Sequence, residues 1–190
     1  MSITQIPTRQ IGDVITCTDV NTLMSNDNDL QSQLSSLKNT VDNNLFSLIV
    51  LQNDVVNNNA VANTLMDTGL QFEVKAGETY AFYVCCIYDA AATTTGARFV
   101  LSGAQTPTFV GYMGTTSLTT TTQTITYANA FNLPSACNAS SAYTTNNIAT
   151  IEGIIRAAAN DTIKVRFASE VASSAITCKA GSYMTVRRVL

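Results

Sequence analysis

The stretch 41-VDNNLFSLIVLQNDVVNNNAVANTL-65 carries an apolar residue at every third or fourth position and twice places an asparagine in that apolar row. Followed back to Val20, the alternation keeps a seven-residue register that never shifts. A register that holds to seven, without drifting toward roughly 3.6 residues per turn, predicts a left-handed coiled coil. We therefore expect a helix from Val20 to Leu65, about 68 Å long at roughly 1.5 Å per residue.

The two asparagines in the row are Asn44 and Asn58, each three residues after a valine. A polar side chain inside a helical bundle costs stability unless a partner satisfies it. Around a three-fold axis, three amides can face one another and share a chloride ion or a water molecule. We therefore expect a parallel trimer with anion layers at both positions, and the alternative is that both amides lie on a solvated edge of an irregular helix. The expected trimer core comprises Leu30, Leu34, Leu37, Val41, Asn44, Leu48, Leu51, Val55, Asn58 and Leu65.

The composition of the chain excludes several classes of function. Its 190 residues are 46% hydrophobic, enough for one domain with an appendage. The net charge of −3 and the scarcity of clustered Lys and Arg argue against nucleic-acid binding. No apolar run approaches the roughly 20 residues of a spanning helix, so we expect no membrane insertion. Histidine is absent, and no phosphate loop, nucleophile motif, metal-ligand spacing or carboxylate pair is found, so we expect no enzyme, no metal and no other cofactor.

The composition changes near Gly69, after which short strand patterns separated by turns predict an antiparallel β-sandwich. In 161-DTIKVRFA-168, Ile163, Val165 and Phe167 share one face, which indicates a half-buried strand. The run 79-TYAFYVCCIYDA-90 is apolar on both faces. This favours a strand covered by the opposing sheet on one side and by a neighbouring subunit on the other, and the alternative is a central strand beneath a loop.

Residues 129–146, NAFNLPSACNASSAYTTN, form the one long stretch without a strand pattern. Long loops in compact domains often carry function. Phe131, Asn132, Asn138 and Tyr143 could present stacking and hydrogen-bonding groups to a glycan or a protein, and an ordinary surface loop is the alternative for each residue.

Residues 149–189, ATIEGIIRAAANDTIKVRFASEVASSAITCKAGSYMTVRRV, resemble the C-terminal strands of jelly-roll domains in structural proteins of tailed bacteriophages. The resemblance lies in Ile151-Glu152-Gly153, in Arg166 to Val171 and in the turn from Lys179 to Ser182. It implies a trimeric, tumour-necrosis-factor-like (TNF-like) head.

The leader, SITQIPTRQIGDVITCTDVNTL, looks like the N-terminal plugs by which phage fibres dock into a virion. A disordered tail is the alternative. The expected anchor residues are Ile3, Ile6, Pro7, Ile11, Val14 and Ile15.

Together these features predict an α plus all-β chain with three parts. Residues 1–19 would dock into the virion, 20–68 would form the long parallel trimeric coiled coil, and 69–190 would form an antiparallel β-sandwich head of the jelly-roll, TNF-like type. We expect a homotrimeric virion fibre or spike that contacts other capsid, neck or tail proteins and aids host-surface attachment. The alternative function is a capsid decoration protein that stabilises the shell without binding a receptor. A depolymerising tailspike would need a carboxylate pair, and the acids of this chain are scattered.

Overall fold

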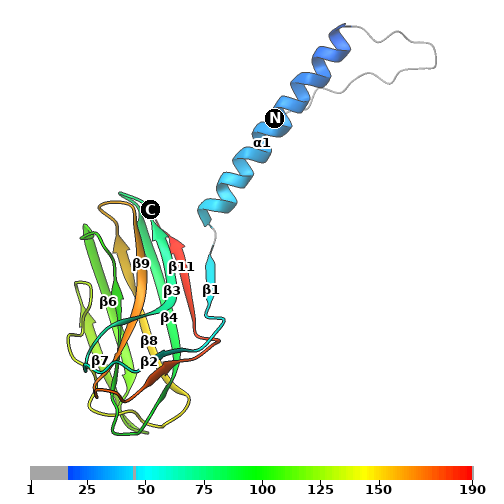
Figure 1. Cartoon of the computed structure of the whole chain (residues 1–190). Helices are drawn as coiled ribbons and strands as arrows, with labels where there is room; N and C mark the ends of the chain where they lie inside the picture. The colour runs from blue at the N-terminus through cyan, green and yellow to red at the C-terminus, as the bar shows by residue number, and fades with distance from the viewer. Residues whose placement is uncertain (1–16, 45, 190) are drawn as a thin grey trace. The chain divides into compact units, whose positions relative to one another are not determined.

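A computed structural model of the chain describes residues 17–44 and 46–189 (Figure 1). The chain divides into two units, Met1–Leu45 and Phe46–Leu190. The described part of the first unit is helix α1 (Cys17–Asn44), a 28-residue segment without glycine or proline. The expected anchor residues Ile3, Ile6, Pro7, Ile11, Val14 and Ile15 lie outside the described residues.

The second unit is an antiparallel β-sandwich, as the sequence predicts for the C-terminal part of the chain. Its strands are β1 (Ser47–Val50), β2 (Val55–Asn57), β3 (Met66–Val74), β4 (Thr79–Ala90), β5 (Ala97–Ser102), β6 (Phe109–Ser117), β7 (Gln123–Ala128), β8 (Asn147–Arg156), β9 (Asp161–Ser169), β10 (Ile176–Cys178) and β11 (Tyr183–Arg188). The assignment of this sandwich as a TNF-like jelly roll stays a prediction.

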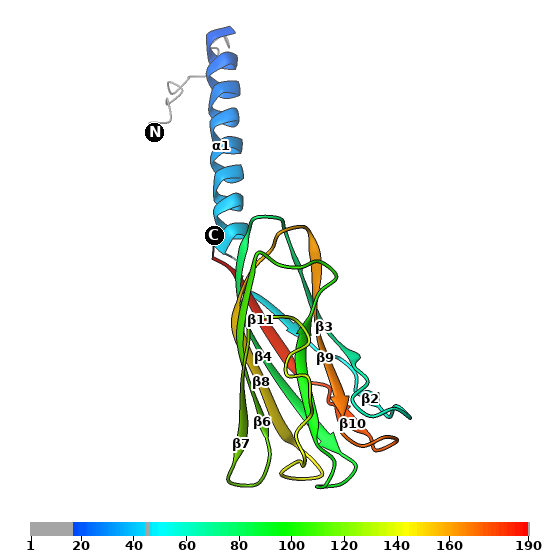
Figure 2. The ribbon, with the colours of Figure 1, turned by 90° about the vertical axis from the view of Figure 1, so that its left-hand side faces the viewer.

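Among the described residues, one sheet has eight strands and the other has three. The larger one, sheet A, runs in the order β1-β11-β4-β8-β6-β7, and β10 pairs with both β4 and β2 beside this path. The smaller one, sheet B, runs β3-β9-β5. Figure 2 shows β2 and β10 side by side at one end of the sandwich. The long strand β4 pairs with β11 along its first half and with β10 at its end, so it organises sheet A.

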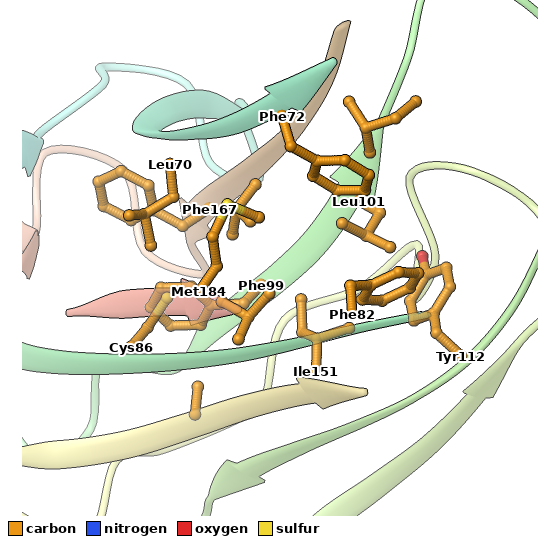
Figure 3. Packing of buried hydrophobic residues seen from close by; sticks show 14 of the residues in the cluster. Leu70, Phe72, Phe82, Cys86, Phe99, Leu101, Tyr112, Ile151, Phe167 and Met184 are labelled. Carbon is orange, nitrogen blue, oxygen red and sulfur yellow. The ribbon is translucent and has the colours of Figure 1, made fainter. Parts of the chain in front are cut away.

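The core lies between the two sheets and is built from side chains that alternate along each strand (Figure 3). The stacked rings of Phe99 and Phe167 lie 5.8 Å apart between centroids, and Tyr88 of sheet A meets Phe99 of sheet B at 5.2 Å. Ile163 and Phe167 are buried on β9, as their alternation with charged residues predicts. Aromatic contacts of this kind bind the two layers together.

The long coiled coil predicted over residues 20–68 is wrong. Helix α1 ends at Asn44, and the chain then enters the sandwich through β1, β2 and β3. β1 pairs with β11, and β2 pairs with β10. The physical reason is the run 46-FSLIVL-51, whose nearly continuous apolar and β-branched residues suit a strand better than a helix with one apolar seam.

The expected trimer-core residues therefore lie in different environments. Leu30, Leu34 and Leu37 are exposed on α1, and Leu48 is exposed on β1. Leu51 and Val55 pack against the sandwich core, Leu65 is half-buried, and Asn58 is exposed. Val41 and Asn44 belong to α1, but their side chains lie outside the described set. Because Asn58 follows β2 while Asn44 ends α1, the two expected anion layers have no common helix on which to form.

The neighbouring residue Asn57 holds this segment in place. Its side-chain amide is 1% exposed and donates hydrogen bonds to the carbonyls of Thr64 and Phe167, both at 2.9 Å. Its carbonyl oxygen accepts a hydrogen bond from the Asn59 side chain, also at 2.9 Å. The buried amide thus satisfies backbone carbonyls and ties β2 to sheet B.

Candidate functional site

Strand β4 is apolar on both faces, as the sequence predicts. Its even-numbered residues from Tyr80 to Ala90 are buried between the sheets. Tyr83, Cys85 and Ile87 point the other way and stay partly exposed to solvent. The side of sheet A that faces away from sheet B therefore carries apolar side chains that the described chain leaves uncovered.

Strand register extends this surface across the whole sheet. One row of paired residues runs Leu48, Thr185, Tyr83, Glu152, Met113 and Tyr127. The next row runs Val50, Tyr183, Cys85, Thr150, Thr115 and Ile125. We call the surface formed by these rows and their neighbours the outer face of sheet A; its large apolar members are Leu48, Val50, Val56, Tyr83, Cys85, Ile87, Phe109, Met113, Ile125, Tyr127, Ile148, Ile154 and Tyr183.

The exposure of this face is large at its aromatic and aliphatic members. Tyr127 is 80% exposed and Leu48 is 62% exposed. The rings of Tyr83 and Tyr183 lie 6.1 Å apart, and burial raises the pKa of the Tyr83 phenol. Contiguous apolar patches rich in tyrosine mark interaction surfaces more often than solvated ones.

Besides Asp89, which pairs with Lys179 at 3.6 Å near the β10 end, three charged residues lie on the outer face of sheet A. Glu152 faces Tyr83 and Met113, and Arg187 and Arg156 lie on β11 and β8 toward one end of the face. None of the three forms an ion pair within residues 17–44 and 46–189. Glu152 and Arg156 lie four residues apart on one strand, about 13 Å at roughly 3.3 Å per residue, and do not pair with each other. The face therefore presents an acid and two arginines that form no ion pair with the described residues.

The side of sheet B that faces away from the core has the opposite character. Asp67 pairs with Lys164 and with Arg166, both at 2.8 Å. Thr162 donates a hydrogen bond to Glu73 at 2.8 Å. The hydrogen bond from Lys164 lowers the pKa of Asp67. These charges are matched within the chain, as expected of a face turned to water.

Helix α1 carries a second uncovered apolar surface. Val20 and Leu23 in its first half, and Leu30, Leu34 and Leu37 in its second, are between 44% and 67% exposed. Their spacing of three, four and seven residues places them on one side of the helix. The unit thus lacks a packed core of its own among its described residues.

The four residues expected to contact a ligand do not form one site. Asn138 is engaged in the fold, since its backbone N–H donates to Ala97 and its amide reaches the carbonyl of Ser117 at 3.3 Å. Tyr143 is exposed beside a hollow lined by the threonine turn 119–122. Phe131 and Asn132 lie together in another hollow, which residues 103–110 and 129–132 line. The structure keeps that pair together and separates it from the other two residues.

The loop that carries these residues runs along the edge of sheet B. Its backbone N–H groups at Asn132, Asn138 and Ser141 donate to carbonyls of Leu101, Ala97 and Thr93 at 2.8 to 3.0 Å. The buried guanidinium of Arg98 donates to the carbonyls of Pro134, Ser135 and Asn63 at 2.9, 2.6 and 2.8 Å. Most of the loop is therefore a cover for the edge of β5, which would otherwise expose unpaired backbone groups.

Of the described cysteines, Cys86 and Cys137 have raised pKa values, whereas contact with Cys86 lowers the pKa of the buried Cys178. Cys85, Cys86, Cys137 and Cys178 are free. Burial raises the pKa of Cys137 to about 11, and contact with Cys178 together with burial raises that of Cys86. Thiols with raised pKa values hold few thiolates at neutral pH and make poor nucleophiles.

Two negative findings apply to the described residues. Residues 17–44 and 46–189 hold no group of three or more His, Cys, Asp or Glu side chains placed to bind a metal ion. In the part of the chain that the structure describes, no helix combines the length and apolar character that crossing a membrane requires.

Comparison with known proteins adds little. No protein-family model matches the chain, and no curated protein matches it. Among solved structures, the chain is similar to VP2 of infectious bursal disease virus in a subviral particle, at 9% identity and a TM-score of 0.24. The alignment covers 76% of this chain and 39% of VP2, so the chain spans well under half the length of that protein. A similarity this weak supports no argument about fold or function, which must come from the surfaces described above.

Proposed function

We propose that the chain is a structural protein of a tailed-bacteriophage particle that assembles as a homotrimeric fibre or spike and aids attachment to the host surface. The observation that carries the proposal is the uncovered outer face of sheet A. A second copy of the chain is the partner that fits this face best.

Burial of this face would stabilise an assembly through ordinary hydrophobic gain. At about 25 cal/mol per Å² of apolar area, a surface with three tyrosines and several branched aliphatic residues supplies a substantial driving force. Tyrosine and methionine are enriched at the centres of protein interfaces, and this face carries Tyr83 on the central strand β4 and Met113 on β6. A face of this composition would be a liability in a protein that works as a monomer.

The charges on the face favour a second copy over an unrelated partner. Glu152 and the arginines Arg156 and Arg187 form no ion pair with one another, but each can face the opposite charge on a neighbouring copy. A single surface that carries both an acid and its bases is self-complementary. The exposed stripe of α1 supports the same conclusion, because each copy brings one and needs a similar apolar surface to cover it.

The anchoring role of residues 1–19 belongs to this proposal. The apolar residues Ile3, Ile6, Ile11, Val14 and Ile15 would contact other virion proteins, leaving the sandwich free to face the host. Several copies in each fibre would multiply weak individual affinities for the surface.

The proposal is tested by reversing one charge on the outer face. We expect Glu152→Arg to raise the dissociation constant of the assembly at least tenfold, because it places a third arginine on a face that already holds Arg156 and Arg187. Light scattering on the full chain measures the mass as a function of concentration. Glu73→Arg on the outward side of sheet B is the matched control and should leave the mass unchanged. Equal effects of both variants would contradict the proposed interface.

The virion role needs a separate measurement. Mass spectrometry of purified particles should detect peptides of the chain at a copy number divisible by three. Absence of the chain from particles would refute the virion role even if the purified protein were a trimer.

A further inference from the structure

The hollow that contains Phe131 and Asn132 has the size of a small-ligand site. Residues 103–110 form one wall and residues 129–132 form the other, and we call this hollow the loop groove. Its volume is about 640 Å³, within the roughly 300 to 1,000 Å³ typical of sites for small molecules.

Both walls of the loop groove are held by hydrogen bonds to residues outside it. The carboxylate of Asp161 accepts hydrogen bonds from the backbone N–H of Gln105 and of Thr162, at 2.9 and 2.8 Å. The opposite wall is pinned because the Tyr112 hydroxyl donates to the carbonyl of Leu133 at 2.6 Å. A groove fixed in this way loses little conformational freedom when it binds a ligand.

Close packing also sets the position of the Phe131 ring. A Cβ added at Gly103 would lie 2.7 Å from the Phe131 ring and 2.6 Å from the carboxylate of Asp161. The absence of a side chain at Gly103 therefore allows the ring to lie against this wall. Phe131 packs partly against the core, while Phe109 at the other side of the groove is 52% exposed.

The polar side chains around the groove are available for hydrogen bonds to a ligand. The side chains of Gln105, Thr106, Thr108, Asn129 and Asn132 are exposed and form no hydrogen bond within the described chain. Elsewhere in residues 129–146, the side-chain amide of Asn138 donates a hydrogen bond to the backbone carbonyl of Ser117, so side-chain amides without a hydrogen bond are not a general property of this loop.

The lining of the loop groove carries no charged side chain. A phosphate or carboxylate ligand would find no cation there to replace its water, and an ammonium group would find no carboxylate, since neither Asp nor Glu lines the groove. What remains is two phenylalanine rings framed by three amides and two hydroxyls. That combination suits a neutral molecule with an apolar face and many hydroxyl groups.

We infer that the loop groove binds a neutral saccharide. A saccharide presents C–H groups on the faces of its rings, which can pack on Phe109 and Phe131 from the two sides of the groove, and hydroxyls around the rim of each ring, which exchange hydrogen bonds with the amides and the threonine hydroxyls. The inference deepens the attachment part of the proposed function and rests on it, by naming the chemical class that the particle would recognise.

Saturation-transfer NMR on the full chain tests this inference. The probes are glucose, galactose, mannose and N-acetylglucosamine, each as the monosaccharide and as a short homo-oligomer. We expect saturation transfer to at least one neutral oligomer. We expect Phe109→Ala and Asn129→Ala each to raise the dissociation constant for that oligomer about tenfold. Tyr143→Ala is the matched control, because Tyr143 is equally exposed but lines a different hollow, and it should leave binding unchanged.

Three results would overturn the inference. One is no signal from any neutral probe at millimolar concentration, and another is preferential binding of sialyllactose or of an acidic or basic peptide. The third is loss of binding in Tyr143→Ala but not in Phe109→Ala. Mass measurements on the same samples separate the two proposals: a trimer that binds no sugar refutes the saccharide site alone, and a monomer that binds sugar refutes the trimer alone.

Discussion

Replacing Asn57 with alanine removes a buried amide that joins β2 to sheet B. The substitution eliminates the hydrogen bonds to Thr64 and Phe167 and the two accepted from the backbone and the side chain of Asn59. Each hydrogen bond contributes about 0.5 to 1.5 kcal/mol net, and the buried Phe167 carbonyl, left without this donor, adds about 1 to 3 kcal/mol. Because such terms overlap, we expect the free energy of unfolding to fall by about 2 to 4 kcal/mol.

Urea denaturation followed by circular dichroism at one protein concentration measures this loss. With a slope of about 2 kcal/mol per molar urea, the midpoint should fall by about 1 to 2 M. The control is the adjacent Asn58→Ala, since Asn58 is exposed and its loss should cost no more than about 0.5 kcal/mol. A coiled-coil arrangement would make Asn58 the buried residue of the two. A larger effect at Asn58 than at Asn57 would therefore refute the placement of this segment in the sandwich.

Further consequences concern packing, charge and the loop cover. Gly153→Ala should destabilise the sandwich by about 1 to 3 kcal/mol in the same assay, because the new Cβ would lie 2.3 Å from a backbone oxygen, whereas Gly114→Ala meets nothing closer than 3.8 Å and should be tolerated. The pKa of Asp67 is lower in the folded than in the unfolded chain. The stability that its ionised form contributes is therefore fully present above the unfolded pKa near 4 and is lost as the pH falls through the folded pKa. The stability of Asp67→Asn should therefore decline less steeply than that of the wild type below about pH 4, and a parallel decline would show that the ion pairs do not matter. Arg98→Met should lower the free energy of unfolding by about 2 to 4 kcal/mol and make residues 129–146 more sensitive to proteolysis, because the loop loses its hydrogen bonds from the guanidinium to Pro134 and Ser135. An unchanged rate of cleavage would contradict the role of Arg98 in holding the loop.

The sandwich could be predicted from the sequence because strand alternation is local. The alternation in 161–168 indicates which residues are buried, and the structure confirms it. For the run 79–90, apolar on both faces, the structure confirms a strand covered by the opposing sheet on one side, and cover by a neighbouring subunit on the other stays a prediction. The end of the helix could not be found from the seven-residue row alone, because the row continues by coincidence through residues that lie in strands. The contrary signal was present in Phe46, Ile49 and Val50, which are apolar at positions that a coiled coil would leave in water.

The interaction surfaces were predictable only in part. The outer side of β4 follows from its sequence, but the neighbours that complete the face, such as Leu48, Met113 and Tyr127, come from pairings between distant segments. The groove depends similarly on Phe109 and Phe131, which lie 22 positions apart in the sequence and share no motif. Such pairings depend on strand order, which local patterns do not encode.

The most direct test of the account is the mass of the full chain by sedimentation equilibrium at micromolar concentration. The two uncovered apolar surfaces predict that the chain associates, and the proposed trimer predicts a species of about 61 kDa, three times the 20.3 kDa chain. A mass of 20.3 kDa across the accessible concentration range would contradict the account, because both apolar surfaces would then remain in water in a protein that functions alone.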